Sequence, residues 1–363
     1  MSSGGWGGRR PDPPPVVRIR IRDLHRSLGR IYARLEDKPL LVILVAAGVT
    51  MAVAVVLASS AGWPHVLRVA AATRSWSWLI ACGIGELLAY AGYVLTVRDM
   101  ARVDRGTELE LSASVSTVVA GFGVFAATRS SGGFAVDYWA FRKAGASRRE
   151  ALRRVLGLNF LEYLILSLAA LGASLLLFAR LDGSASLGAT LPSLTVLPAI
   201  ALAAWATSPQ RVHRLSKPRR GWLRRLAADS VAGAAMVRKL LTSPREHGLG
   251  VIGNSLYWAG DILCLWAALQ LVHAHLHIAV LVLAYSGGYV LTRRALPAGG
   301  AGIVEAALTL ALTGFGLHPA RALIAVLIYR LFNFWLPIIP ALALMPTIRQ
   351  LRRRYQHAET QTA

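Results

Sequence analysis

Residues 40–61 read LLVILVAAGVTMAVAVVLASSA and contain no charged side chain. A helix of this length rises about 1.5 Å per residue, so it can cross the roughly 30 Å hydrocarbon core of a bilayer. Stretches of similar length and composition recur along the chain, and 55% of its 363 residues are hydrophobic. We therefore predict an all-α integral membrane protein with six long transmembrane helices. Their predicted ranges are 40–61, 75–97, 155–179, 187–207, 249–272 and 320–345.

The basic residues predict the orientation of the chain. It carries 40 Lys and Arg against 18 Asp and Glu, and 33 of the 40 fall in segments that would lie on one side of the membrane. Short loops rich in Lys and Arg stay in the cytoplasm, where the anionic leaflet attracts them. We therefore expect both termini in the cytoplasm of a bacterium, with the protein in its inner membrane, and no nucleic-acid partner. The basic segments are 1–39, 98–110, 129–154, 209–247 and 346–363.

The charge pattern also divides the chain. Residues 40–345 form the predicted transmembrane domain, 209–247 a basic cytoplasmic loop within it, and 346–363 a cytoplasmic tail. In the N-terminal segment 1–39, apolar residues from Val17 to Leu35 recur at steps of three and four, while most arginines fall off that face. This pattern predicts a basic amphipathic helix on the membrane surface. The alternative is a helix that packs on cytoplasmic loops or on a partner.

Two shorter apolar stretches, 111–128 and 278–291, are each followed by a polar, glycine-rich break. The breaks read RSSGG at 129–133 and RRALPAGG at 293–300, and a second short helix at 302–315 is predicted after the latter. Irregular backbone at membrane depth is tolerated only where protein or water surrounds it. We therefore predict two broken re-entrant hairpins. The alternative is two short full spans per hairpin, which gives eight to ten spans in total.

The hairpins belong to two similar units, at about 75–179 and 249–345. Each unit has a span with one acid in its middle, Glu86 or Asp261, followed by a glycine pair and a second acid, Asp137 or Glu305. By the span count, the two units enter the membrane from opposite faces. Inverted repeats with broken helices are a recurring plan of transporters, and we predict that plan here.

Charged residues remain inside the predicted spans, at a cost of about 2.5–3.5 kcal/mol each at a helix centre. They must therefore face one another or water, either as structural ion pairs or as a polar cavity for a charged headgroup. The adjacent Arg293 and Arg294 favour the cavity, because guanidinium groups bind phosphate with paired donors. The predicted headgroup cavity contains Arg293, Arg294, Gly299, Gly300, Glu305, Arg330, Asp261, Glu86, Glu162 and Asp137.

No common catalytic motif accompanies these charges. The sequence lacks a GxxxxGK[ST] phosphate-binding loop, a GxSxG elbow and an HExxH zinc motif. His273, His275 and His277 lack a second ligand cluster, and the cysteines Cys82 and Cys264 lie inside spans. We therefore expect no catalytic residue, no metal and no cofactor.

The segment 296–307, LPAGGAGIVEAA, followed by Tyr329-Arg330-Leu331 and Phe334-Trp335-Leu336-Pro337, resembles a known family. It is similar to the membrane domain of bacterial lysyl-phosphatidylglycerol synthase/flippase proteins and their stand-alone relatives. The region from Gly132 to Glu162 resembles the first motif of that family, in which a Pro-Gly pair, an acid and an arginine are usual. Here Ser131-Gly132-Gly133 replaces the Pro-Gly pair, and Asp137 stands near the position of the acid. The resemblance covers residues 40–345.

The resemblance implies a flippase, a protein that moves a lipid between leaflets. Its partners would be membrane lipids, either an anionic phospholipid or a lipid-linked headgroup. The synthases carry an aminoacyl-transfer domain after the membrane part, and we expect no such reaction from residues 1–363. Two alternatives remain: an accessory membrane subunit of a glycosyltransferase or lipid-modifying system, and an intramembrane enzyme acting on a lipid headgroup. A second copy of the chain or a lipid-synthesising enzyme would be a further partner.

Overall fold

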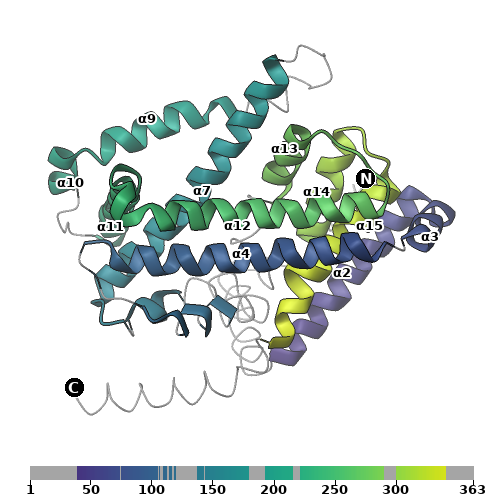
Figure 1. Cartoon of the computed structure of the whole chain (residues 1–363), viewed down its shortest axis with the longest axis horizontal. Helices are drawn as coiled ribbons and strands as arrows, with labels where there is room; N and C mark the ends of the chain where they lie inside the picture. Colours follow the sequence, from purple (N-terminus) through teal and green to yellow (C-terminus); the bar gives the residue numbers. More distant parts are fainter. Residues whose placement is uncertain are drawn as a thin grey trace, which may run out of the picture.

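The structure is a computed structural model, and the part of the chain that it describes is entirely helical apart from turns and short connections (Figure 1). Four helical segments in this part are long and apolar enough to cross a membrane: Leu41–Ala61, Trp76–Arg102, Arg148–Ala179 and Pro319–Pro340. They confirm the prediction of an all-α membrane protein. The described residues are 39–73, 75–104, 106, 109–112, 114–116, 118–119, 137–142, 144–179, 193–215, 221–289 and 300–340.

Two long helices, α4 (Trp76–Arg102) and α12 (Pro244–Leu271), lie side by side through the middle of the molecule (Figure 1). They run antiparallel, because Gly85 of α4 meets Gly260 of α12 while Gly92, further along α4, meets Gly253, further back on α12. Helix α12 overlaps the predicted span 249–272. It is less apolar than the four segments above, since its middle holds polar residues such as Asp261.

Five helices gather at one end of the α4–α12 pair, on the right in Figure 1. The α15 helix contacts α2, α3 and α14, and α13 lies against α14. Apolar side chains of α2, α3 and α15, among them Ala58, Val66 and Leu323, form a small core between them. The short helix α3 was not predicted from the sequence. The helices are α2 (Pro39–Ala61), α3 (Trp63–Ala72), α13 (Ile278–Tyr289), α14 (Ile303–Gly314) and α15 (Pro319–Arg330), and the π-helix η2 (Leu331–Trp335) continues α15.

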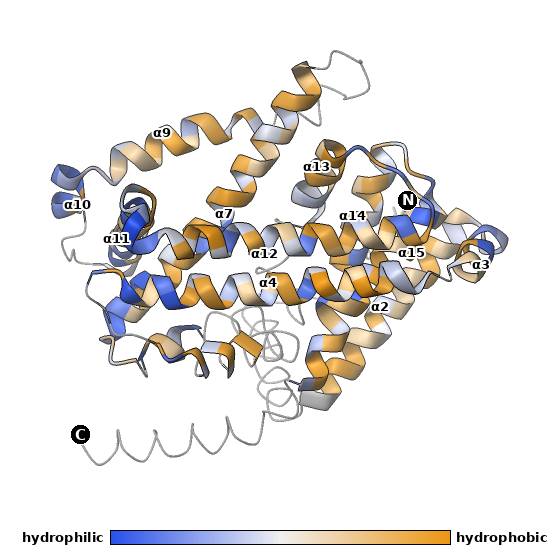
Figure 2. Ribbon diagram, in the orientation of Figure 1, coloured by the Kyte–Doolittle hydropathy of each residue, from blue (hydrophilic) through white to orange (hydrophobic). Residues whose placement is uncertain are grey.

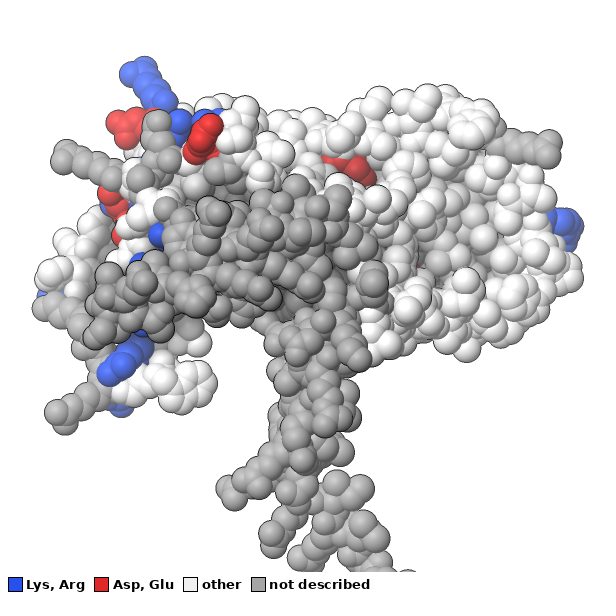
Figure 3. All heavy atoms as spheres, turned by 90° about the horizontal axis from the view of Figure 1, so that it is seen from below, with Lys and Arg blue, Asp and Glu red and all other residues white. Residues whose placement is uncertain are grey.

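The other end of the pair is more polar. Figure 2 shows hydrophilic residues on α10 and α11, whereas α2 and α9 are mostly hydrophobic. Seen from below, the charged side chains gather over one end of the described surface, and most of the remainder is uncharged (Figure 3). This arrangement suits a protein that lies across a membrane with one charged end in water. The helices here are α7 (Arg148–Ala179), α9 (Val196–Ala206), α10 (Pro209–Leu215) and α11 (Trp222–Thr242).

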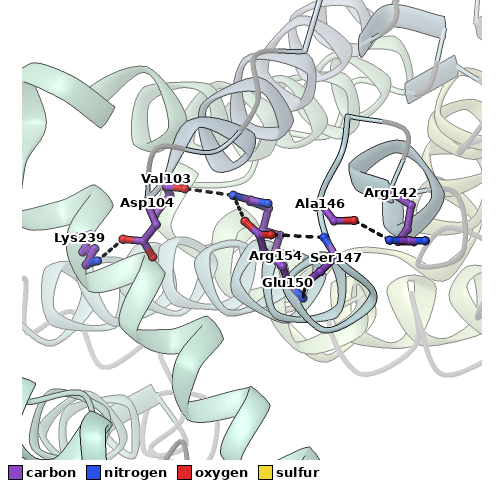
Figure 4. Close-up of polar contacts among 8 residues, drawn as sticks. All are labelled: Val103, Asp104, Arg142, Ala146, Ser147, Glu150, Arg154 and Lys239. Carbon is purple, nitrogen blue, oxygen red and sulfur yellow. Dashed lines mark hydrogen bonds and ion pairs between the residues drawn. The ribbon is translucent and has the colours of Figure 1, made fainter.

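Polar contacts fix this charged end (Figure 4). Arg154 of α7 is 1% exposed. It pairs with Glu150 at 2.7 Å, and its Nη2 donates to the carbonyl oxygen of Val103 at 3.1 Å (Figure 4). Nearby, Lys239 of α11 pairs with Asp104, which follows α4. The beginning of α7 is therefore tied to the end of α4, and α11 is tied to the same place.

The shorter predicted elements have different outcomes. Helices α13 and α14 agree with the predicted short helices of the second hairpin, and each has 12 residues. At about 1.5 Å per residue each is about 18 Å long, well short of about 30 Å. The predicted span 187–207 is described from residue 193, and α9 begins at Val196. The predicted amphipathic helix within 1–39, the glycine-rich break at 129–133 and the tail 346–363 lie outside the described residues.

Candidate functional site

A buried ion pair joins α14 to α15. The Nε of Arg330, in the last turn of α15, donates to Oε1 of Glu305 at 2.9 Å. Glu305 is 0% exposed and Arg330 is 1% exposed. The Arg330 guanidinium carbon also lies 4.3 Å from the centre of the Phe334 ring, on the turn that follows. The carboxylate and the aromatic ring together offset the free-energy cost of removing this guanidinium from water.

The start of α14 positions the carboxylate of this pair. Gly302, with φ of 83°, precedes the helix, and its backbone N–H donates to Oε2 of Glu305 at 2.7 Å. Because glycine has no side chain, Glu305 alone supplies the cap. Gly300 also has a positive φ, 68°, which favours glycine at that position. The glycines of the predicted hairpin thus turn the chain so that Glu305 lies in the first turn, where the helix dipole stabilises a negative charge.

Asp261 of α12 is the centre of a second buried network. Its Oδ1 accepts hydrogen bonds from Tyr329 Oη at 2.9 Å and from Asn333 Nδ2 at 2.7 Å. Its Oδ2 accepts one from the hydroxyl of Tyr285, on α13. Asp261 is 0% exposed, and these three hydrogen-bond donors come from three elements besides α12. Because Tyr329 and Arg330 are consecutive, the Asp261 network and the ion pair form one polar cluster.

Glu86 of α4 completes this cluster. Its side chain is buried, and its carboxyl lies close to the Asp261 carboxyl. The close approach depends on the preceding residues, Gly85 and Gly260. A Cβ on Gly85 would lie 2.6 Å from the Gly260 carbonyl oxygen, and one on Gly260 would lie 2.4 Å from the Gly85 carbonyl oxygen. The glycines therefore let the two backbones touch at the level of the two acids.

The remaining acids of the predicted cavity lie further along the α4–α12 pair. Asp137 accepts a hydrogen bond from the hydroxyl of Tyr93 at 2.9 Å, and Tyr93 is about 10 Å along α4 from Glu86. Glu162 of α7 is buried, and its backbone oxygen accepts from the indole N–H of Trp258 at 2.9 Å. The structure thus brings Glu86, Asp261, Glu305 and Arg330 together. It places Asp137 and Glu162 beside other residues of α4 and α12.

A row of aromatic rings connects the two regions. The ring of Tyr93 lies 5.4 Å from that of Tyr257, which is 4.8 Å from Trp258. Trp258 lies 6.0 Å from Tyr285, and Tyr285 lies 6.4 Å from Tyr329. The row begins at the partner of Asp137 and ends at two partners of Asp261. All five side chains are buried, so the row packs as part of the core while its polar atoms bind the two acids.

Several site residues were not predicted from the sequence. Tyr285 and Tyr329 bind Asp261, and the hydroxyl oxygen of Thr50 lies 3.5 Å from Oε1 of Glu305. In the sequence, these tyrosines differ from other aromatic residues of an apolar helix only by one hydroxyl group. That difference is too small to predict a site residue. Three residues of the predicted cavity, Arg293, Arg294 and Gly299, lie outside the described part of the chain.

The cluster defines a class of protein. Carboxylates, a guanidinium and phenol hydroxyls meet inside an all-α membrane protein, without a group of three or more metal-ligating side chains among the described residues. Such a site can bind a charged or zwitterionic group at membrane depth. The molecule is therefore a polytopic membrane protein with a buried polar centre.

Comparison with known families gives the more specific assignment. Residues 40–341 match the family described as the lysylphosphatidylglycerol synthase TM region. The match covers most of the chain, so the chain belongs to this family, and a role connected with membrane lipid follows. It also confirms the family identified from the glycine-rich segment 296–307. No curated protein matches the chain.

Proposed function

We propose that the protein is a flippase that moves a charged lipid between the two leaflets of a bacterial inner membrane. The observation that carries this proposal is the buried cluster of Glu305, Arg330 and Asp261, assembled at the start of a helix too short to cross the bilayer. A headgroup crossing the membrane needs polar partners at that depth, because each unsatisfied polar group costs several kcal/mol in hydrocarbon. No covalent step is part of this proposal.

The substrate is an anionic phospholipid or a lipid-linked headgroup. Its phosphate would meet the first turn of α14, where backbone N–H groups and the helix dipole favour an anion. Arg330 supplies a fixed positive charge there, and the sequence adds Arg293 and Arg294 in the preceding break. We propose that α13 and α14 form a re-entrant hairpin, since neither helix is long enough to cross alone and they lie against each other.

Transport in vesicles tests this function. The purified full chain, reconstituted with a fluorescent anionic phospholipid, is expected to let a membrane-impermeant quencher reach label from the inner leaflet, and protein-free vesicles are not. Arg294→Gln is expected to slow this movement about tenfold or more, because a hydrogen bond to a charged group contributes about 1.5–3 kcal/mol. Arg321→Gln is the matched control, since Arg321 is exposed and binds only the carbonyl oxygen of His273 among its described contacts. Vesicles with protein that behave like empty vesicles would refute the proposal and favour an accessory subunit or an enzyme.

The proposed orientation gives a separate prediction. Tags at both termini and in the 209–247 loop are expected to be inaccessible from outside the cell, and a tag at Asp182 is expected to be accessible. The reason is the concentration of Lys and Arg in the first three segments. Accessibility of engineered single cysteines to a membrane-impermeant thiol reagent, in intact and in lysed cells, measures this. External labelling of the 209–247 loop would contradict both the orientation and the opposed entry of the two repeats.

A further inference from the structure

Helix α11 lies across the long helices at the charged end of the molecule. Figure 1 shows α11 nearly end-on, whereas α4 and α12 are seen along their length. Its later turns pack on α7, where Gly233 meets Gly157, and the buried residues of α11 run from Ala228 to Leu240. The residues before them, 222–227, are all exposed. The first turns of α11 therefore extend beyond the helices that cover the rest of it.

The end of α9 shows where α11 lies relative to the membrane. Helix α9 contains only apolar and aromatic residues and none of them is buried, so acyl chains are its expected surroundings. Its last turn carries Trp205, and the guanidinium carbon of Arg211 lies 4.1 Å from the centre of the Trp205 ring. Tryptophan and arginine gather where the hydrocarbon meets the headgroups. Arg238 of α11 donates to the carbonyl oxygen of Ala204 at 3.3 Å, so α11 lies at this boundary.

The exposed first turns of α11 are amphipathic. Trp222, Leu223 and Leu226 are 73%, 62% and 42% exposed. At about 100° per residue these three fall within one third of the helix circumference, and Arg224 and Arg225 fall outside it. The first turn has no acidic residue. In water this face would expose three large apolar side chains, whereas at a membrane surface they meet acyl chains while the arginines meet phosphates.

We propose that the first turns of α11 lie in the headgroup region of the leaflet on the charged side of the protein, where Arg224 and Arg225 bind the phosphates of anionic phospholipids. A helix that crosses the long helices can lie in the plane of that leaflet. Guanidinium groups bind phosphate oxygens with paired donors. Among the residues that the structure describes, neither arginine pairs with a carboxylate. This surface is separate from the buried pair of Glu305 and Arg330, and the inference does not depend on lipid movement.

Quenching by brominated lipids tests this contact in the full chain. A fluorophore is attached at Ala227→Cys, and it reacts there alone because the native Cys82 and Cys264 are 0% exposed. The vesicles contain phosphatidylcholine and phosphatidylglycerol at equal mole fractions, with bromine on the acyl chains of one lipid or of the other. Brominated phosphatidylglycerol is expected to quench at least about twofold more strongly at low salt. This preference is expected to fade at about 1 M salt, where the Debye length is about 3 Å.

The double variant Arg224→Gln/Arg225→Gln is expected to lose the preference for phosphatidylglycerol and to keep quenching by both lipids, since the apolar face remains. The matched control Arg68→Gln/Arg245→Gln removes the same charge from α3 and α12 and should keep the preference. All four arginines are exposed, so both double variants are expected to fold, which a thermal-unfolding curve checks.

Three results would overturn the inference. Absence of quenching by either lipid in the wild type would place the first turns of α11 in water or against a protein partner. Equal quenching by the two lipids at low salt would refute the contact with anionic phosphates. An unchanged preference in Arg224→Gln/Arg225→Gln would show that other residues bind the lipid.

Discussion

Replacement of Gly260 by leucine is expected to leave little folded protein. The first atom of any side chain there would lie 2.4 Å from the backbone oxygen of Gly85 and 2.6 Å from the backbone nitrogen of Ala89. Backbone cannot move aside as a flexible side chain can, so α4 and α12 would have to separate. Overpacking a core with extra carbon atoms typically costs about 1–3 kcal/mol, and we expect the upper end or more here. The measurements are the yield of monodisperse protein in detergent and its unfolding temperature.

Gly92→Leu should behave like Gly260→Leu, since a Cβ on Gly92 would lie 2.4 Å from the Gly253 carbonyl oxygen. The matched controls are Gly48→Leu in α2 and Gly172→Leu in α7. No atom lies within 4 Å of a Cβ built at either position. Both controls also replace a helical glycine by leucine. A stability difference between them and Gly260→Leu therefore reports the lost helix contact and not the change of residue type. A Gly260→Leu protein as stable as the Gly172→Leu protein would show that the α4–α12 contact is not required for the fold.

The second large effect concerns the buried pair of Glu305 and Arg330. Arg330→Met is expected to destabilise the protein by about 3–5 kcal/mol, because it leaves a buried carboxylate without its cation. Glu305→Gln is expected to destabilise the protein by a similar amount, because it removes the carboxylate that pairs with the buried Arg330 guanidinium. The double variant Glu305→Gln/Arg330→Met removes both charges and is expected to recover most of the stability. Glutamine keeps an oxygen that can accept from the Gly302 N–H, so the cap of α14 survives.

The double variant separates a structural from a functional role. If the pair binds the headgroup, the stable double variant is expected to move lipid at least about tenfold more slowly than the wild type, per folded molecule, since it has lost a charged hydrogen-bond donor. Thermal unfolding and transport in vesicles, on the same preparation, measure both quantities. Arg321→Gln again controls for loss of an arginine from α15. Wild-type transport per folded molecule in the double variant would show that the pair only stabilises the helices.

Much of the architecture could be predicted because hydropathy is a local property. The absence of charge from residues 40–61 is enough to identify a membrane helix, whatever it packs against. Breaks at glycine-rich segments are also local, so α13 and α14 agree with the predicted short helices. The family could be identified from one contiguous segment, 296–307, and the match over residues 40–341 confirms it. Each of these conclusions needs only neighbours along the chain.

The partners within the polar cluster required the tertiary structure. The sequence places Glu86, Asp261 and Arg330 inside predicted spans and Glu305 in the second predicted hairpin. The cost of burying a charge says only that each of them needs a partner. Which partner it meets depends on how closely two helix backbones approach, and Gly85 and Gly260 decide this by having no side chain. The tyrosines that bind Asp261 come from α13 and α15. The sequence does not distinguish their hydroxyl groups from those of other buried tyrosines. The sequence by itself therefore determined the membrane class, the family and the charged residues. Only the packing of α4 against α12 decided that Glu86 and Asp261 lie close together, because contacts between distant segments depend on the shape of both surfaces.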